Sequence, residues 1–297
     1  MNATRLAAII LTRNESRDLP ACLESLVGLT ADIYVIDSGS SDATLDIARR
    51  FGANILEHEF VNYATQFNWA LDQLPAADNA STWVLRIDAD ERISPELKDS
   101  LLRALPAIPE RVSGISMARR TNFLGKSIRW GDTYPVWLLR IWRADRGRCE
   151  DTWMDEHIIL KSGDVMKVSG DLIHDIPKSL SEWTSKHNWY ADRECADILA
   201  ISEPSLRVAG QAKLKRWVKQ NLYLRLPLFS RPLLYWIYRY FLKLGFLDGR
   251  QGLIYHFLHA FWYRFLVDAK LYEIQQASQK PQPDGARPKP KGAMSSE

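Results

Sequence analysis

Two aspartates, Asp88 and Asp90, are the residues whose types and spacing point most directly to chemistry. They follow an apolar run from Trp83 to Ile87, and on extended backbone residues at this spacing point the same way. Two carboxylates aimed at one point repel each other unless a cation lies between them. Mg²⁺ and Mn²⁺ prefer such oxygen ligands and are commonly shared with substrate phosphates. By itself, however, the pair is better explained by a polar turn leading into a helix capped by Ser94.

The elements that must position these aspartates follow a regular alternation. Short apolar runs that read as strands are separated by stretches with helical spacing of apolar residues, and the strands are expected at 6–11, 32–37, 53–57 and 83–87. Such alternation predicts an α/β fold with a mostly parallel sheet and helices on both faces. In sheets of this kind, ligands bind beyond the carboxyl ends of the strands.

Polar clusters occur where these predicted strands end. They comprise residues 12–15, 37–42 and 88–90. An acid beyond the second strand, here Asp37, can bind a ribose or a base edge, and metal-binding carboxylates can hold a diphosphate. The sequence contains neither a Gly-x-Gly-x-x-Gly motif nor a Walker loop, so the usual dinucleotide and P-loop sites lack their key feature.

A second acidic pair, Asp155 and Glu156, could supply a general base that deprotonates an acceptor hydroxyl. With a metal-bound diphosphate as leaving group, this set permits sugar transfer from a nucleotide sugar by single displacement, with inversion at the anomeric carbon. Two further residues have alternative roles. Arg140 either steadies a phosphate or pairs with an acid, and His174 either contacts metal or phosphate or makes a structural hydrogen bond.

The charge of the chain is unevenly distributed. Residues 207–297 carry 16 Lys/Arg against 5 Asp/Glu, whereas the rest of the chain is net acidic. From 207 to 274 the cations alternate with aromatic and aliphatic residues, which favours helices lying in an anionic lipid headgroup layer. A nucleic-acid-binding module and a buried helical subdomain with a solvated basic face are the alternatives. The tail at 275–297 is rich in Pro, Lys, Gln and Ser and is expected to be disordered.

The cellular compartment is predicted from several absences. The three cysteines, Cys22, Cys149 and Cys195, show no metal-like or disulfide-like spacing. The N-terminus leads directly into the first strand without a signal peptide, and the run from Leu253 to Val267 is too short and polar to span a bilayer. We therefore expect a cytoplasmic protein bound peripherally to the cytoplasmic face of the inner membrane.

Four motifs in order give the chain a resemblance to a known family. They are AIILTRNE (8–15), VIDSGSSD (35–42), QFNWA (66–70) and IDADE (87–91). Together they resemble glycosyltransferase family 2, most closely the bacterial lipopolysaccharide-core and exopolysaccharide transferases, and the segments at 245–253 and 269–273 are similar to the tail of that subgroup. The resemblance covers nearly all of residues 5–273 and is specific for the family, much less so for the substrate.

The resemblance implies a GT-A (Rossmann-like) domain over residues 1–206 with a C-terminal amphipathic helical extension. It also implies a sugar donor linked to UDP or to another nucleotide, a divalent cation (Mg²⁺ or Mn²⁺), and a lipid-linked or glycan acceptor. By position, the nucleoside is held by Thr12, Arg13, Asn14, Glu15 and Asp37, and the donor is approached by Gln66 and Asn68. Asp88 contacts ribose or sugar and can share the metal with Asp90, which also faces the diphosphate. Glu156 is the favoured base, with Asp155 as the alternative.

Two rival functions are weighed against this one. A sugar-phosphate nucleotidyltransferase has a similar sheet and uses Mg²⁺, but it carries a glycine-rich phosphate loop that residues 12–15 do not provide. A nucleic-acid-binding protein acting through its basic C-terminal segment would not need the acidic clusters, and no recognised nucleic-acid motif is present. We therefore expect no nucleic-acid partner.

Overall fold

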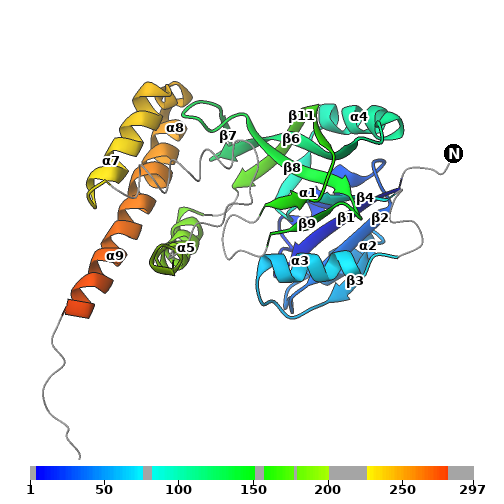
Figure 1. Ribbon diagram of the computed structural model, residues 1–297, viewed down its shortest axis with the longest axis horizontal. Coiled ribbons are helices and arrows are strands. Elements are labelled where there is room, and N and C mark those ends of the chain that lie inside the picture. Colours follow the sequence, from blue (N-terminus) through cyan, green and yellow to red (C-terminus); the bar gives the residue numbers. More distant parts are fainter. Residues whose placement is uncertain (1–4, 76–81, 151–156, 177–178, 201–225, 280–297) are drawn as a thin grey trace, which may run out of the picture.

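The chain consists of a sheet flanked by helices and a separate group of C-terminal helices, which Figure 1 shows side by side. The structure, a computed structural model, describes residues 5–75, 82–150, 157–176, 179–200 and 226–279. The predicted acidic pair at 155 and 156, the predicted domain boundary at 206, and nearly all of the predicted tail lie outside these residues.

The first half of the chain has the predicted β-α alternation. Its elements are β1 (Arg5–Thr12), α1 (Leu19–Leu26), β2 (Asp32–Asp37), α2 (Thr44–Arg50), β3 (Asn54–Glu57), α3 (Tyr63–Asp72) and β4 (Thr82–Arg86). β1 lies between β2 and β4, and all of these pairings are parallel, as is the pairing of β2 with β3. The carboxyl ends of these strands therefore meet at one edge of the sheet.

The second half extends the same sheet with mixed strand directions. It contains β5 (Glu91–Ile93), α4 (Pro95–Ala104), the 3₁₀ turn η2 (Leu105–Ala107), β6 (Val112–Phe123), β7 (Lys126–Ile128), β8 (Val136–Arg143), β9 (Gly147–Cys149), β10 (Ile158–Leu160) and β11 (Asp164–Ile176). The strand order is β3-β2-β1-β4-β8-β6-β11-β5, with β7 on β6, and β9 pairs with β10 separately. Because β8 is antiparallel to both β4 and β6, strands β6 and β11 run in the same direction as β1 and β4. Their carboxyl ends therefore reach the same edge.

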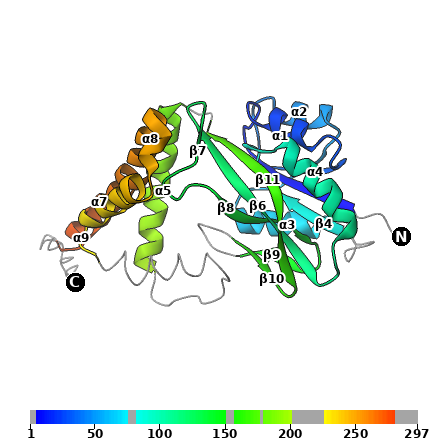
Figure 2. The same ribbon diagram turned by 90° about the horizontal axis from the view of Figure 1, so that it is seen from above.

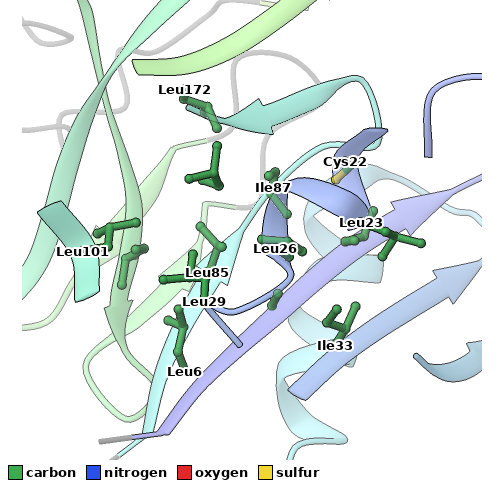
Figure 3. Packing of buried hydrophobic residues seen from close by; sticks show 14 of the residues in the cluster. Leu6, Cys22, Leu23, Leu26, Leu29, Ile33, Leu85, Ile87, Leu101 and Leu172 are labelled. Atoms are coloured by element: carbon green, nitrogen blue, oxygen red, sulfur yellow. The ribbon is translucent and has the colours of Figure 1, made fainter. Parts of the chain in front are cut away.

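Alternate residues of the central strands enter two separate cores, which explains the continuous apolar runs. In β1, Leu6, Ala8 and Ile10 pack towards α1, α2 and α4, within the cluster drawn in Figure 3. Ala7 and Ile9 instead pack towards α3, together with Phe67 of that helix. The prediction of strands buried on both faces is thus confirmed.

The C-terminal helices form a unit of their own beside the sheet. It comprises α5 (Leu180–Ala200), α7 (Ser230–Ile237), the π-helical turn η4 (Tyr238–Leu242), η5 (Gly245–Asp248), α8 (Gly249–His256), the π-helical turn η6 (Phe257–Trp262) and α9 (Tyr263–Gln279). α5 packs against α9 through Ala191, Cys195 and Val267. Within the described chain, no helix is both long and apolar enough to cross a bilayer.

This architecture confirms the predicted fold class, a GT-A-like α/β sheet with a C-terminal helical extension. Two local predictions differ from it. The sequence from 165 to 169 reads as a short strand of its own, but it is part of the long strand β11, whose register shifts between Lys167 and Asp171 without ending the strand. The predicted start of disorder at 275 is wrong for the first few residues, because α9 continues to Gln279.

The irregular part of β11 yields a stability prediction. Gly170 has φ +95°, and a Cβ there would lie 2.2 Å from the backbone nitrogen of Leu97 at the start of α4. Gly52 also has a positive φ, but a Cβ there would meet nothing within 4 Å. Gly52→Ala should therefore cost only the left-handed backbone, about 1–2 kcal/mol. Gly170→Ala must also displace a helix and should cost more than about 3 kcal/mol. Urea unfolding of both variants measures this difference, and equal losses would contradict the predicted clash.

Candidate active site

The loop after β2 is built around the buried carboxylate of Asp37. It accepts hydrogen bonds from the backbone nitrogens of Gly39 (2.9 Å) and Ser40 (2.7 Å) and from the hydroxyl of Thr12 (2.9 Å). Gly39 has φ +81°, a conformation that favours glycine and lets the chain turn back over the carboxylate. Asp37 and Thr12 thus join the ends of β1 and β2, and their predicted contact with the nucleoside stays a prediction.

The turn after β1 is fastened to the same loop. Asn14 adopts a left-handed conformation (φ +56°), and its side-chain oxygen accepts from the backbone nitrogen of Ser41 at 2.8 Å. The backbone nitrogen of Glu15 donates to the Thr44 hydroxyl at 2.8 Å. The predicted donor-binding residues Arg13, Asn14 and Glu15 therefore lie beside Asp37 at the carboxyl edge of the sheet.

Two amides of α3 were also predicted to approach the donor. The side-chain nitrogen of the buried Gln66 donates to the Ser38 hydroxyl at 2.6 Å. Gln66 therefore helps to hold the loop that follows Asp37. Asn68 makes two hydrogen bonds to the backbone of Cys149, at 2.9 and 3.0 Å, and so links α3 to β9. This geometry gives Asn68 a structural role, and the donor contacts of both amides stay predictions.

Asp88 and Asp90 lie in the turn between β4 and β5 rather than on extended backbone, so the expectation that they point the same way was wrong. Asp88 accepts from the Tyr63 hydroxyl at 2.8 Å and pairs with Arg140 at 3.1 Å. Asp90 pairs instead with His174, its carboxylate 3.4 Å from Nε2 of that ring. The turn redirects each carboxylate to its own partner.

Arg140 is buried and pairs with two carboxylates, Asp88 and Glu91, the latter at 2.6 Å. Burial alone would raise the pKa of Asp88, but Arg140 and Arg86 hold it below its usual range. The pKa of Glu91 is raised, chiefly by burial and with a contribution from Asp88, although Arg140 opposes the shift. Of the two roles considered for Arg140, the structure therefore supports pairing with acids.

Asp90 and His174 are the described residues that best fit a divalent cation. Burial raises the pKa of Asp90, but His174 outweighs this effect and keeps the carboxyl ionised. The Nδ1 atom of His174 is buried and has no hydrogen-bond partner among the residues that the structure describes. The Asp90 carboxylate is the kind of ligand that Mn²⁺ and Mg²⁺ prefer, and substrate phosphates would supply further oxygen ligands. The His174 imidazole is a softer ligand beside it. No group of three or more such ligands occurs in the described ranges.

A cation from the C-terminal unit also faces this edge. Burial alone would lower the pKa of Lys186 on α5, but Tyr190, Asp90 and Glu15 together raise it above its ordinary value. Lys186 thus lies within the electrostatic reach of both acids, where an anionic ligand would be favoured. The sequence reasoning did not assign Lys186 or Tyr63 to the site, because a single residue inside a helix gives no signal without its neighbours in space.

Comparison with known proteins decides the family. The sequence model of the protein family glycosyl transferase family 2 matches residues 7–155. This range contains the carboxyl ends of β1, β2 and β4, but not that of β11. The chain belongs to glycosyl transferase family 2. It is therefore a glycosyltransferase, and the alternative of a nucleotidyltransferase is set aside.

Among relatives, this family 2 glycosyltransferase is similar to the lipopolysaccharide core biosynthesis glycosyltransferase LpsC of Rhizobium meliloti, with 29% identity over 95% of this chain and 97% of that protein. A PGL/p-HBAD biosynthesis glycosyltransferase of Mycobacterium bovis is 33% identical over 46% of this chain and 54% of that protein. A solved structure of glucosyl-3-phosphoglycerate synthase from Mycobacterium tuberculosis, in complex with Mn²⁺, UDP and glucosyl-3-phosphoglycerate, matches with a TM-score of 0.33 and 20% identity. That match covers 40% of this chain and 45% of the other.

The buried pairing of Arg140 yields a second prediction. Arg140→Met leaves the carboxylates of Asp88 and Glu91 without their cation and should lower the free energy of unfolding by about 3–5 kcal/mol at pH 8. The pKa of Glu91 is already raised and now loses the opposing effect of Arg140, so it rises further. The folded variant therefore binds more protons than the unfolded chain, and its stability falls as pH rises. The deficit should shrink at pH 5, as measured by urea unfolding at both pH values.

Arg49→Met is a matched control because Arg49 pairs with Asp46 at an exposed position on α2. It should change stability by less than about 1 kcal/mol at either pH. A deficit of Arg140→Met that is the same at pH 5 and pH 8 would contradict the role assigned to Arg140.

Proposed function

We propose that the chain is an inverting glycosyltransferase. It moves a sugar from a nucleotide-sugar donor, UDP-linked in our proposal, to a hydroxyl of a lipid-linked, lipopolysaccharide-core or exopolysaccharide acceptor. The observation that carries the proposal is the placement of Asp88 and of the Asp90–His174 pair at the carboxyl ends of β4 and β11, on the same edge of the sheet as the Asp37 loop. The name of the R. meliloti relative supports the class of acceptor.

In this proposal the edge of the sheet holds the donor in two parts. The nucleoside lies against the turn after β1 and the Asp37 loop, where Arg13, Asn14 and Glu15 are grouped. Asp88 is fixed by Tyr63 and Arg140 and is about one-third exposed, so it can accept a hydrogen bond from a ribose or sugar hydroxyl. A donor bound in this way has its diphosphate near Asp90.

Asp90 and His174 would hold the divalent cation, with Asp88 as a further candidate ligand, and this cation would offset the charge that grows on the leaving nucleoside diphosphate. Lys186 would add a second positive charge on the side of the C-terminal helices. The protein thereby supplies a fixed electrostatic environment for the departing group before the reaction begins.

The chemical step that we propose is a single displacement. The acceptor oxygen forms a bond to the anomeric carbon from the face opposite the diphosphate, while the bond from that carbon to the diphosphate oxygen breaks. The acceptor proton passes to a carboxylate, for which Glu156 is favoured and Asp155 is the alternative. One displacement inverts the configuration of the sugar.

The location of the protein is part of the proposal. An acceptor carried by a lipid is reached most readily by a transferase that stays at the cytoplasmic face of the inner membrane. The excess of cations after residue 207 would hold the chain there by attraction to anionic lipids.

Substitution of the proposed metal ligand tests this function. Asp90→Asn should lower release of UDP from a panel of UDP-sugars by about 100-fold or more, because the charge that stabilises the leaving group is lost. His174→Ala should weaken Mn²⁺ binding about 10–100-fold, measured directly by electron paramagnetic resonance without substrate. Asp46→Asn, at an exposed position, serves as the control. Unchanged Mn²⁺ binding in both site variants would exclude this pair as the metal site.

The assignment of the base is tested separately. Glu156→Gln should retain donor binding but lower transfer about 10²–10⁴-fold, because the acceptor hydroxyl keeps its proton. Mass spectrometry of glycosylated lipid acceptors measures transfer, and calorimetry measures donor binding. If Asp155→Asn abolishes transfer while Glu156→Gln leaves it unchanged, the base is one residue earlier in the chain.

A further inference from the structure

One edge of the C-terminal unit exposes large apolar side chains in unusual density. It runs from α7 through η4 to η5 and is formed by Leu234, Ile237, Phe241, Leu242, Phe246 and Leu247, which are 37–72% exposed. We call these six residues the apolar edge. Scattered exposed apolar residues are normal, but such a concentration marks a surface that is covered in use.

The backbone beneath the apolar edge is distorted in ways that hold it outward. Leu244, between its two halves, has φ +59°, a left-handed conformation that is rare for a bulky residue. Residues Tyr238–Leu242 form a π-helical turn, in which the extra residue changes the direction of the following side chains. Such strain persists where the surrounding structure enforces it, and it is commonly associated with function.

The chain segment that forms the apolar edge exposes charges of one sign. From residue 226 to 265, the exposed charged side chains are those of Lys243 and Arg250, whereas the one acid of this stretch, Asp248, is buried. Lys243 lies within the edge itself, next to Leu242. An apolar surface whose own segment exposes cations complements the headgroup layer of an anionic membrane, where the cations meet phosphates and the rings and branched chains reach the acyl region. Asp132 is an exposed acid on the adjoining loop, next to Gly131, whose backbone nitrogen donates to the Lys243 carbonyl at 2.8 Å.

The underside of this region is hydrogen-bonded to the loop between β7 and β8 of the catalytic sheet. The carboxylate of Asp248 accepts from the backbone nitrogens of Arg129 and Trp130, at 3.1 and 2.9 Å. Arg239 donates to the Gly131 carbonyl and the Thr133 hydroxyl, each at 2.6 Å. Figure 2 shows the resulting approach of α8 and β7. The edge is therefore held in a fixed orientation to the sheet that carries the site.

We propose that the apolar edge inserts into the headgroup layer of an anionic bilayer. This insertion orients the catalytic edge of the sheet towards a membrane-borne acceptor, and this part of the proposal rests on the proposed function. A second copy of the chain, or a further segment of this chain, are the other possible occupants of the edge. The cations that the segment of the edge itself exposes, Lys243 and Arg250, favour lipid over either one.

Vesicle binding of the full-length protein tests this proposal. Leu242→Asp changes the most exposed residue of the edge and should weaken partitioning into phosphatidylglycerol-containing vesicles about tenfold or more, because a charge enters the acyl boundary. Val27→Asp, at a comparably exposed apolar position outside the edge, should bind as the unchanged protein does. Lys243→Glu should weaken binding to anionic vesicles and leave the weak binding to phosphatidylcholine vesicles unchanged.

A fluorescent label at Leu242→Cys identifies the occupant, because Cys22, Cys149 and Cys195 are buried and compete poorly for the label. Insertion predicts an exposed label in solution and a blue shift with quenching by brominated lipids. Three results would each overturn the proposal. A label that is shielded without vesicles would mean that protein covers the edge, and a lower mass of Leu242→Asp in light scattering would mean that a second copy does. Unchanged vesicle binding of Leu242→Asp would mean that the edge does not insert. UDP release from a soluble donor tests the proposed function independently, since it needs no membrane.

Discussion

The buried guanidinium of Arg140 is the interaction on which the organisation of the site depends. Asp88 and Glu91 flank a turn at the end of a buried strand, and two carboxylates so close in a low-dielectric setting would repel each other without a cation. Arg140 reaches both from β8, the strand inserted antiparallel between β4 and β6. The change of strand direction in the middle of the sheet is thus what brings the cation to the acids.

The turn between β4 and β5, held by Arg140, gives Asp88 and Asp90 different partners. Because Asp88 is bound by Tyr63 and Arg140, its position is fixed before any ligand arrives. Asp90 faces the other side and meets His174, which comes from the far part of the sheet. Asp88, held in place beside the Asp90–His174 pair, suits a ligand that carries both hydroxyls and a diphosphate. Because Asp88 is already fixed, little reorganisation is needed when charge develops.

The sequence was sufficient for the features that repeat locally. Apolar runs such as Leu6 to Leu11 revealed the buried strands, and Ser94 with Pro95 marked the start of α4 as expected. Four ordered motifs then identified the family. The sequence was insufficient where residues far apart meet, as with Tyr63 and Asp88 or His174 and Asp90, because pairings across strands leave no periodic pattern. It also failed for the Asp88–Asp90 turn, since a two-residue spacing indicates a shared direction only on extended backbone.

The packing of α5 against α9 has a consequence for how the protein folds during its synthesis. Lys186, the cation that faces Asp90 and Glu15, belongs to a helix whose buried partners include Val267 and Leu271. On the ribosome, the strands of the sheet emerge long before those partners, and domains generally fold as they are made. The strands of the acidic edge can therefore form early, whereas Lys186 takes its place there after α9 has been synthesised and has packed against α5. The electrostatic environment of the site thus depends on packing between two helices that are far apart in the sequence.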